Sequence, residues 1–255
     1  MSEAAAVPSV HETVYRVRFD EAGPEGSLRT SGLMRFAQDL AWLHSTALGF
    51  GREWYAERGL TWLVRAAELE VLAPIPMGTN VLARTEVVGM RRVFARRLGQ
   101  FRLADGTPAA RVTTDWVLID DRGALTRVPA VFGELFGVGD ASFSIGRVAI
   151  GQPPATAAGH DLVVRPHEVD PYGHANNAIY LDWLEETIDA AGGGEAVAAL
   201  PRRYRLEYAL AAEAGAALTA AAWSGPGDWS FRLTRAATGE EVFRAKVDLT
   251  TEEDR

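Results

Sequence analysis

The stretch from Asp170 to Asn177 reads Asp-Pro-Tyr-Gly-His-Ala-Asn-Asn and concentrates reactive side chains at one place. It contains a carboxylate, an imidazole and two carboxamides, and its proline and glycine favour a sharp turn between the first two groups. Apolar residues at helical spacing follow directly, which predicts that these groups stand at the N-terminus of a helix. A carboxylate can activate water or attack a carbonyl, and helix N-terminal amides stabilise an oxyanion. The stretch therefore holds the parts needed for acyl-transfer chemistry.

Each polar residue of this stretch has a catalytic and a structural interpretation. We assign Asp170 as general base or nucleophile, although an aspartate before a proline also initiates turns. His174 can orient the substrate or a water molecule, or it can be a structural capping residue. Asn176 and Asn177 are natural helix caps and also offer carboxamide donors. Gly173 allows the backbone to approach a ligand closely, which makes it a candidate for substrate binding.

The same stretch resembles the catalytic motif of the acyl-acyl-carrier-protein (acyl-ACP) thioesterases, a family of hot-dog fold enzymes. That motif is Asp-x-Asn-x-His-x-Asn-Asn, and its Asp, His and paired Asn correspond to Asp170, His174 and Asn176 with Asn177. The resemblance implies hydrolysis of acyl-ACP to a free fatty acid without a cofactor. It also implies that Asp170, His174 and Asn176 are catalytic and that Asn177 binds substrate. Tyr172 stands where the motif has its first Asn, so we expect the Tyr172 hydroxyl or Asn176 to contact the substrate instead.

The family also uses a catalytic Glu two residues before a Gly, and Glu213-Ala214-Gly215 fits this local pattern. The resemblance therefore adds Glu213 to the catalytic candidates. The spacing from the preceding Leu-Glu-Tyr element is longer than in the family, so that Glu207 competes for the assignment. Glu213 corresponds to Pro76 in an internal repeat of the chain, and the repeat itself does not demand an acid there.

That repeat is visible as two copies of one pattern. Leu69-Glu70-Val71 followed by Gly78 in the first half corresponds to Leu206-Glu207-Tyr208 followed by Gly215 in the second half, at equal spacing. A segment with helical periodicity precedes each copy. Such degenerate self-similarity indicates a duplicated domain.

Each half reads as a strand, a helix and then several short strands, which predicts an α+β fold with an antiparallel sheet. The resemblance implies a tandem, or double, hot-dog fold, in which each unit is one long helix wrapped by a curved sheet. We place the two units at 1–128 and 160–255, with a connection at 129–159. In the second unit, the glycine run at 192–194 predicts the end of the helix.

The first unit lacks the reactive residues of the second. The segment that corresponds to 170–177 is Gly23-Pro24-Glu25-Gly26-Ser27-Leu28-Arg29-Thr30, which has no histidine and no paired asparagine. The first unit is therefore interpreted as a degenerate partner that supplies acyl-binding surface.

Composition limits the class of protein and of partner. The 255 residues carry a net charge of −8, which argues against nucleic acid as the main partner. The absence of cysteine excludes disulfides, thiolate-bound zinc and a cysteine nucleophile. No apolar run approaches the roughly 18 residues of a membrane span, and the acidic start at 1–6 lacks the pattern of a signal peptide. We therefore expect a cytoplasmic protein without a membrane span, and the sequence leaves a homodimer open.

A run of arginines stands out in this acidic chain. Acidic carrier proteins and the phosphates of coenzyme A (CoA) would both bind such a run, and we take Arg91 and Arg92 as substrate-binding candidates. The alternative is that these are alternating strand residues pointing to water. The run consists of Arg91, Arg92, Arg96, Arg97 and Arg102.

Other candidate sites receive structural interpretations. Glu185 and Glu186 lie within the second helical segment, where some hot-dog thioesterases carry a catalytic base, but we interpret them as a solvated helix face. His160, His167 and His174 recur every seven residues, which fits no helical ligand pair or known metal motif, and we predict no metal site. Four tryptophans are interpreted as core residues, namely Trp42, Trp54, Trp62 and Trp116.

Three functions follow as hypotheses. The first is hydrolysis of acyl-ACP, which the resemblance favours. The second is hydrolysis of acyl-CoA at the same site. The third is a hot-dog protein that binds an acyl thioester without cleaving it, and the departure at Tyr172 keeps this alternative open.

Overall fold

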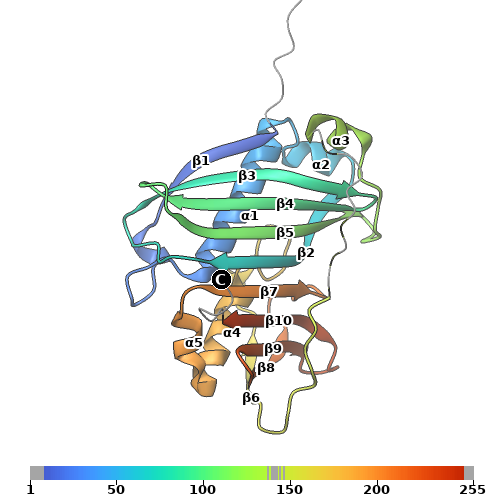
Figure 1. Cartoon of the computed structure of the whole chain (residues 1–255). Helices are drawn as coiled ribbons and strands as arrows, with labels where there is room; N and C mark the ends of the chain where they lie inside the picture. The colour runs from blue at the N-terminus through green and yellow to red at the C-terminus, as the bar shows by residue number, and fades with distance from the viewer. Residues whose placement is uncertain (1–8, 137, 139–142, 144, 146, 250–255) are drawn as a thin grey trace, which may run out of the picture.

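The computed structural model describes residues 9–136, 138, 143, 145 and 147–249. These residues form a ten-stranded antiparallel sheet in the order β1-β3-β4-β5-β2-β7-β10-β9-β8-β6. The first five strands of that order come from the first half of the chain and the last five from the second half (Figure 1). The acidic start at 1–6 and parts of the predicted connection at 129–159 lie outside the described residues.

The strands alternate buried and exposed positions, as expected where one face of a sheet is covered. In β4, for example, every second residue from Ala95 to Phe101 is buried. The bounds are β1 Val10–Arg16, β2 Leu60–Val71, β3 Asn80–Arg91, β4 Phe94–Leu103, β5 Pro108–Asp120, β6 Ala158–Val163, β7 Arg202–Tyr208, β8 Ala217–Gly225, β9 Asp228–Arg235 and β10 Glu241–Leu249.

Two helices cover the sheet. Helix α1 (Thr30–Ala47) lies behind the strands of the first half, and α4 (Ile179–Ile188) lies behind those of the second half (Figure 1). Each helix presents an apolar stripe to the core, such as Leu33, Ala37 and Leu40 in α1. The shorter helices are α2 Arg52–Glu57, α3 Ala130–Phe136 and α5 Gly194–Ala198.

The same backbone hydrogen bond occurs at equivalent positions of the two units. The Asp170 N–H donates to the His174 carbonyl oxygen at 2.8 Å. At the corresponding turn of the first unit, the Gly23 N–H donates to the Ser27 carbonyl oxygen, also at 2.8 Å. The first unit therefore keeps the backbone of the 170–177 turn without its side chains.

Equivalent residues of the two units meet at their boundary. Arg35 on α1 and Asp182 on α4 differ by the same 147 positions as Gly23 and Asp170, and they form an ion pair of 3.1 Å. Strands β2 and β7 pair with each other, which joins the two half-sheets into one. The result is the predicted tandem hot-dog, in which two helix-and-sheet units share one sheet that stays open at β1 and β6.

The glycine run at 192–194 ends the helix that begins with α4, as predicted, because Gly192 leaves the helical conformation. The helical backbone continues past Ile188 to a kink at Gly192, and the separate short helix α5 begins at Gly194. Gly192 adopts a φ of 87°, a conformation that glycine reaches without strain. A Cβ atom on Gly193 would lie 2.5 Å from the ring of Trp229, so the run also permits close packing at this kink.

Glu207 on β7 is a buried structural acid at the junction of the units. Its carboxylate accepts hydrogen bonds from Arg65 at 3.1 Å and from the Val148 N–H at 3.0 Å, and Arg244 lies 3.7 Å away. We expect Glu207→Ala to lower the free energy of unfolding by about 3 kcal/mol, because it leaves buried donors without an acceptor. Urea unfolding measures this loss, and Glu207→Gln should show a smaller one. Unchanged stability with lost turnover would instead make Glu207 catalytic.

Candidate active site

A cavity of about 780 Å³ lies where the two units meet. Its volume falls within the roughly 300–1,000 Å³ typical of small-molecule sites. The first unit supplies walls from α1, α2, β2, β3, β4 and β5, and the connection supplies α3. The second unit supplies the turn at 170–177 together with residues 208–211. Trp42, Trp62 and Trp116 line this cavity. The interpretation as a core residue was wrong for the exposed Trp42, whereas Trp62 and Trp116 also pack against the buried clusters.

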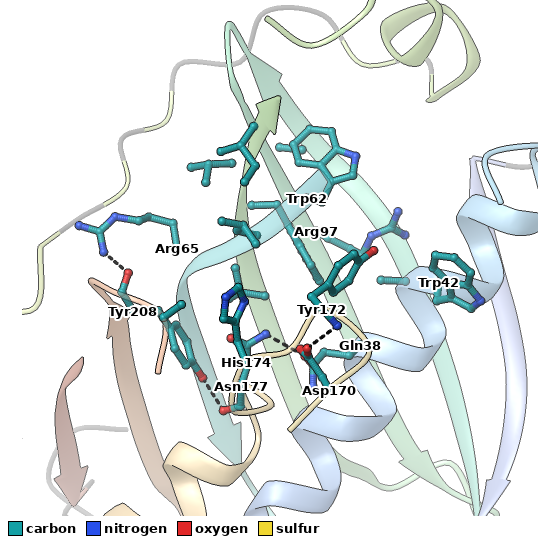
Figure 2. Close-up of a pocket in the computed structure, with 18 of the residues that line it drawn as sticks. Gln38, Trp42, Trp62, Arg65, Arg97, Asp170, Tyr172, His174, Asn177 and Tyr208 are labelled. Carbon is teal, nitrogen blue, oxygen red and sulfur yellow. Dashed lines mark hydrogen bonds between the residues drawn. The ribbon is translucent and has the colours of Figure 1, made fainter. Parts of the chain in front are cut away.

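The turn that carries Asp170 opens onto this cavity (Figure 2). The Asp170 carbonyl accepts the Gly173 N–H at 2.9 Å, and its side-chain Oδ1 accepts the Tyr172 N–H at 2.9 Å. Gly173 closes the turn with a φ of 86°, which side chains disfavour. Asp170 Oδ2 makes no hydrogen bond or ion pair with any residue that the structure describes, so one carboxylate oxygen is left for a ligand.

Asn176 stabilises the turn that leads into α4. Its side-chain Oδ1 accepts the Ala178 N–H at 3.0 Å and its carbonyl accepts the Ile179 N–H at 2.9 Å. The N-cap of α4 itself is Ala178, which has no side-chain cap hydrogen bond, so Asn176 caps the turn before the helix and not the helix as predicted. By contrast, the Asn177 N–H finds no acceptor within the described ranges, and Asn177 lines the cavity. An amide in this position is available to a ligand oxygen at the start of the helix.

Gln38 on α1 of the first unit holds both asparagines and was missed by sequence reasoning. The Gln38 Nε2 donates to Asn176 Oδ1 at 3.2 Å, and the Asn177 Nδ2 donates to Gln38 Oε1 at 2.9 Å. The Tyr208 hydroxyl donates to the Asn177 carbonyl at 2.9 Å, and burial raises the pKa of Tyr208, which keeps this donor protonated. Gln38 belongs to the stretch Phe36-Ala37-Gln38-Asp39, which also resembles the family, and this resemblance is the sequence signal for it.

Tyr172 and His174 both line the cavity. Tyr172 is 55% exposed, and burial of its remaining surface together with the charge of Asp170 raises the pKa of its hydroxyl, which remains a donor at neutral pH. His174 is half-buried and pairs with Glu213 through an isolated antiparallel bridge. The structure thus brings Asp170, Tyr172, His174 and both asparagines to one wall.

The two candidate glutamates lie elsewhere. Glu213 is exposed, is not part of the cavity lining and forms an ion pair with Arg235 at 3.2 Å. Partial burial opposes ionisation of Glu213, but its backbone hydrogen bond, Arg235 and His174 together lower its pKa. Glu207, its competitor, also lies outside the lining and is taken up by the structural contacts given above. Glu213 is therefore the one of the two that adjoins the turn.

The arginine run does not form one surface. Arg91 and Arg92 are exposed at the β3–β4 hairpin and lie outside the cavity lining, and Arg91 donates to the Phe143 carbonyl at 3.2 Å. Arg96 is engaged by Asp115 through two hydrogen bonds of 2.6 and 2.7 Å. Arg97 points inward and lines the cavity, because it shares the inward face of β4 with Ala95. Neither interpretation of the run, as a docking patch or as water-facing residues, holds for Arg97.

Glu185 was wrongly interpreted as a solvated residue. It accepts a hydrogen bond from the Tyr204 hydroxyl, and burial raises its pKa, an effect that hydrogen bonds from Tyr204 and Thr30 partly offset. Glu185 lies 147 positions after Gln38, so it is the counterpart of Gln38 at the degenerate turn. Thr30 likewise stands where the second unit has Asn177. A closed polar network therefore occupies the place of a second site.

Two further findings concern metals and membranes. No group of three or more His, Asp or Glu side chains is arranged to hold a metal ion among the described residues. In the same residues, no helix combines the length and apolar character required to cross a bilayer.

Family models match both halves of the chain. Residues 8–134 match the acyl-ACP thioesterase N-terminal domain, and residues 151–248 match the acyl-ACP thioesterase C-terminal domain. A comparison with curated proteins by sequence gives no match.

Solved structures share the fold over almost the whole chain. A putative oleoyl thioesterase from Lactobacillus plantarum has a TM-score of 0.83 at 21% identity, covering 97% of this chain and 99% of that one. An acyl-ACP thioesterase from Bacteroides thetaiotaomicron has a TM-score of 0.77 at 17% identity, covering 94% and 97%. The 12:0-ACP thioesterase from Umbellularia californica has a TM-score of 0.76 at 21% identity, with the same coverage.

These TM-scores establish a common fold. The two family models together span most of the sequence. The tandem hot-dog, the cavity between its units and the motif at 170–177 agree with that match. The chain belongs to the acyl-ACP thioesterase family and is a hydrolase of acyl thioesters.

Proposed function

We propose that the thioester is hydrolysed at the wall formed by Asp170, His174 and Asn177, with the acyl group in the cavity. One observation carries this proposal. Asp170, with one carboxylate oxygen free of partners among the described residues, and Asn177, with an unused N–H, both line the same 780 Å³ cavity. A base and an oxyanion donor are thus available to one bound carbonyl.

In the general-base route, a water oxygen attacks the carbonyl carbon while Asp170 accepts the proton of that water. The carbonyl oxygen gains negative charge and is stabilised by the Asn177 N–H and the helix N-terminus. Collapse of the intermediate breaks the carbon–sulfur bond, and Asp170 returns the proton to the leaving sulfur. The products are a free fatty acid and the carrier thiol.

In the alternative route, Asp170 attacks the carbonyl carbon directly and the thiolate leaves. Water then hydrolyses the resulting anhydride. In both routes we assign His174 and Asn176 to orienting the reactants, and Glu213 to supporting His174 from its exposed side. Tyr172 and Gly173 complete the substrate-facing surface of the turn.

The carrier is the next part of the proposal. We assign acyl-ACP as the substrate and place its docking near Arg91 and Arg92, since carrier proteins are acidic. Equal acyl groups on carrier protein and on CoA should differ in kcat/KM by about tenfold or more in favour of carrier protein. Thiol release measures this ratio, and Arg91→Glu with Arg92→Glu should reduce it.

Equal or faster turnover of acyl-CoA would overturn the carrier assignment and leave acyl-CoA hydrolysis. Binding without thiol release would instead support the non-catalytic alternative. We further propose that the protein acts in the cytoplasm in fatty acid metabolism. We also keep the proposed unit boundaries at 1–128 and 160–255. A homodimer stays a prediction that sedimentation velocity would test.

A further inference from the structure

Arg97 is a buried cation on the inner face of a central strand. Its neighbours on that face of β4 are Ala95, Gly99 and Phe101, so an apolar residue is the expected occupant. Arg97 is only 8% exposed, and it is part of the cavity lining. Figure 2 shows it among the side chains that surround the pocket. A charge in this place is costly unless something compensates it.

The protein compensates the charge of Arg97 only in part. Its Nη1 lies 2.9 Å from His44 Nδ1 and 3.4 Å from the Thr85 hydroxyl, and the ring of Phe136 lies 5.8 Å from the guanidinium carbon. A ring nitrogen, a hydroxyl and an aromatic face offer few acceptor positions to a guanidinium with five donors. No carboxylate forms an ion pair with Arg97 in the part of the chain that the structure describes.

The position of Arg97 can be related to the reacting end of the cavity through α1. Gln38 contacts the asparagines of the catalytic turn, and His44, which contacts Arg97, lies six residues further along the same helix. At a rise of about 1.5 Å per residue, His44 lies roughly 9 Å from Gln38 along the axis of α1. Arg97, which contacts His44, is displaced from the catalytic turn by a similar distance. An acyl chain that leaves the thioester carbonyl into this cavity would pass it.

Arg97 remains a cation during turnover. Burial lowers its pKa to about 10, which still leaves the group protonated at neutral pH. A plain alkyl chain would displace water from the guanidinium and return no hydrogen bond, which is unfavourable. A carboxylate would instead match its paired donors with two parallel bonds.

We propose that the cavity takes acyl groups with an acceptor oxygen on the acyl chain, bound by Arg97, and that a terminal carboxylate suits this site best. The proposal rests on the proposed function, because it assumes that the acyl group occupies this cavity. It narrows the substrate class from any fatty acyl group to oxygenated ones.

Matched thioesters test this inference. Hexanoyl, octanoyl and decanoyl groups would be compared with analogues of equal length that end in a carboxylate or a hydroxyl, all on the carrier that the protein accepts. We expect kcat/KM to be about tenfold or more higher for an oxygenated member of at least one length. The two analogues distinguish an anionic from a neutral acceptor. A preference for the methyl-ended substrate at every length would overturn the proposal.

Variants assign the preference to Arg97. Arg97→Leu should remove or reverse it, whereas Arg102→Leu, an exposed change on the same strand, should leave it unchanged. An oxygenated preference that survives in folded Arg97→Leu would also overturn the assignment. If Arg97→Leu fails to fold, the comparison of substrates with the wild-type protein still decides whether the cavity prefers oxygenated acyl groups.

If the proposed hydrolysis is wrong, the two hypotheses can still be tested separately. In that case no thioester is cleaved, and binding of octanedioate against octanoate to the wild-type protein, measured by calorimetry, decides the inference. Tighter binding of octanedioate, lost in Arg97→Leu, supports a site for oxygenated chains even in a non-catalytic protein. Equal or weaker binding of octanedioate contradicts it.

Discussion

Asp170→Asn should lower kcat for acyl-ACP hydrolysis by about 10²–10⁴-fold, the range expected for loss of a general base. A carboxamide can still accept the Tyr172 N–H that Asp170 Oδ1 accepts at 2.9 Å, so the turn should keep its shape. It cannot accept a proton from water or attack the carbonyl. We therefore expect kcat to fall while KM changes little, in steady-state assays of thiol release.

The matched control for this variant is Glu25→Gln. Glu25 is exposed on the corresponding turn of the first unit, which repeats the backbone of the catalytic turn without its reactive side chains. Glu25→Gln should leave kcat unchanged, which would show that loss of an acid from such a turn does not by itself reduce turnover. Turnover of Asp170→Asn within about threefold of wild type would remove Asp170 from the mechanism.

Gln38→Leu should lower kcat/KM by about 10- to 100-fold. Gln38 bonds the side chains of Asn176 and Asn177 across the unit boundary, and leucine would leave both carboxamides without these partners. Each lost partner costs about 1–3 kcal/mol if the group stays buried, and a part of that cost should fall on the alignment of the Asn177 N–H. Steady-state kinetics and thermal unfolding, measured on the same samples, separate alignment from stability.

Glu185→Gln provides the comparison, because Glu185 occupies the equivalent place in the second helix and contacts the degenerate turn. It should change thermal stability and leave kcat/KM close to wild type. If Gln38→Leu and Glu185→Gln have equal effects on thermal stability and on kcat/KM, Gln38 is a structural residue. Its hydrogen bonds to Asn176 and Asn177 then have no special importance for catalysis.

The sequence predicted the fold and one wall of the site because both depend on local pattern. Strand and helix periodicity, with the repeated Leu-Glu element, led to two units of one fold. The turn at 170–177 forms through Pro171, Gly173 and the Asp170 side chain, all within a few residues of one another. Interactions between residues this close in the chain can be predicted from a single sequence.

The residues that were missed act across the unit boundary or across the sheet. Gln38 and Asn177 are 139 positions apart, and their bond exists only because the two units pack together. Glu185 looked solvated because its partner Tyr204 comes from a later strand. Arg97 looked like one member of a basic run, and only the register of β4 shows that it faces inward.

The most direct test of the central claim is thiol release by the wild-type protein at catalytic concentration, with acyl-ACP of several chain lengths and end groups. A thiol-reactive dye gives no background from the enzyme, since the chain has no cysteine. We predict many turnovers per molecule on at least one substrate, with release of the free acid. Binding of acyl-ACP by the folded protein without any turnover would contradict hydrolysis at Asp170.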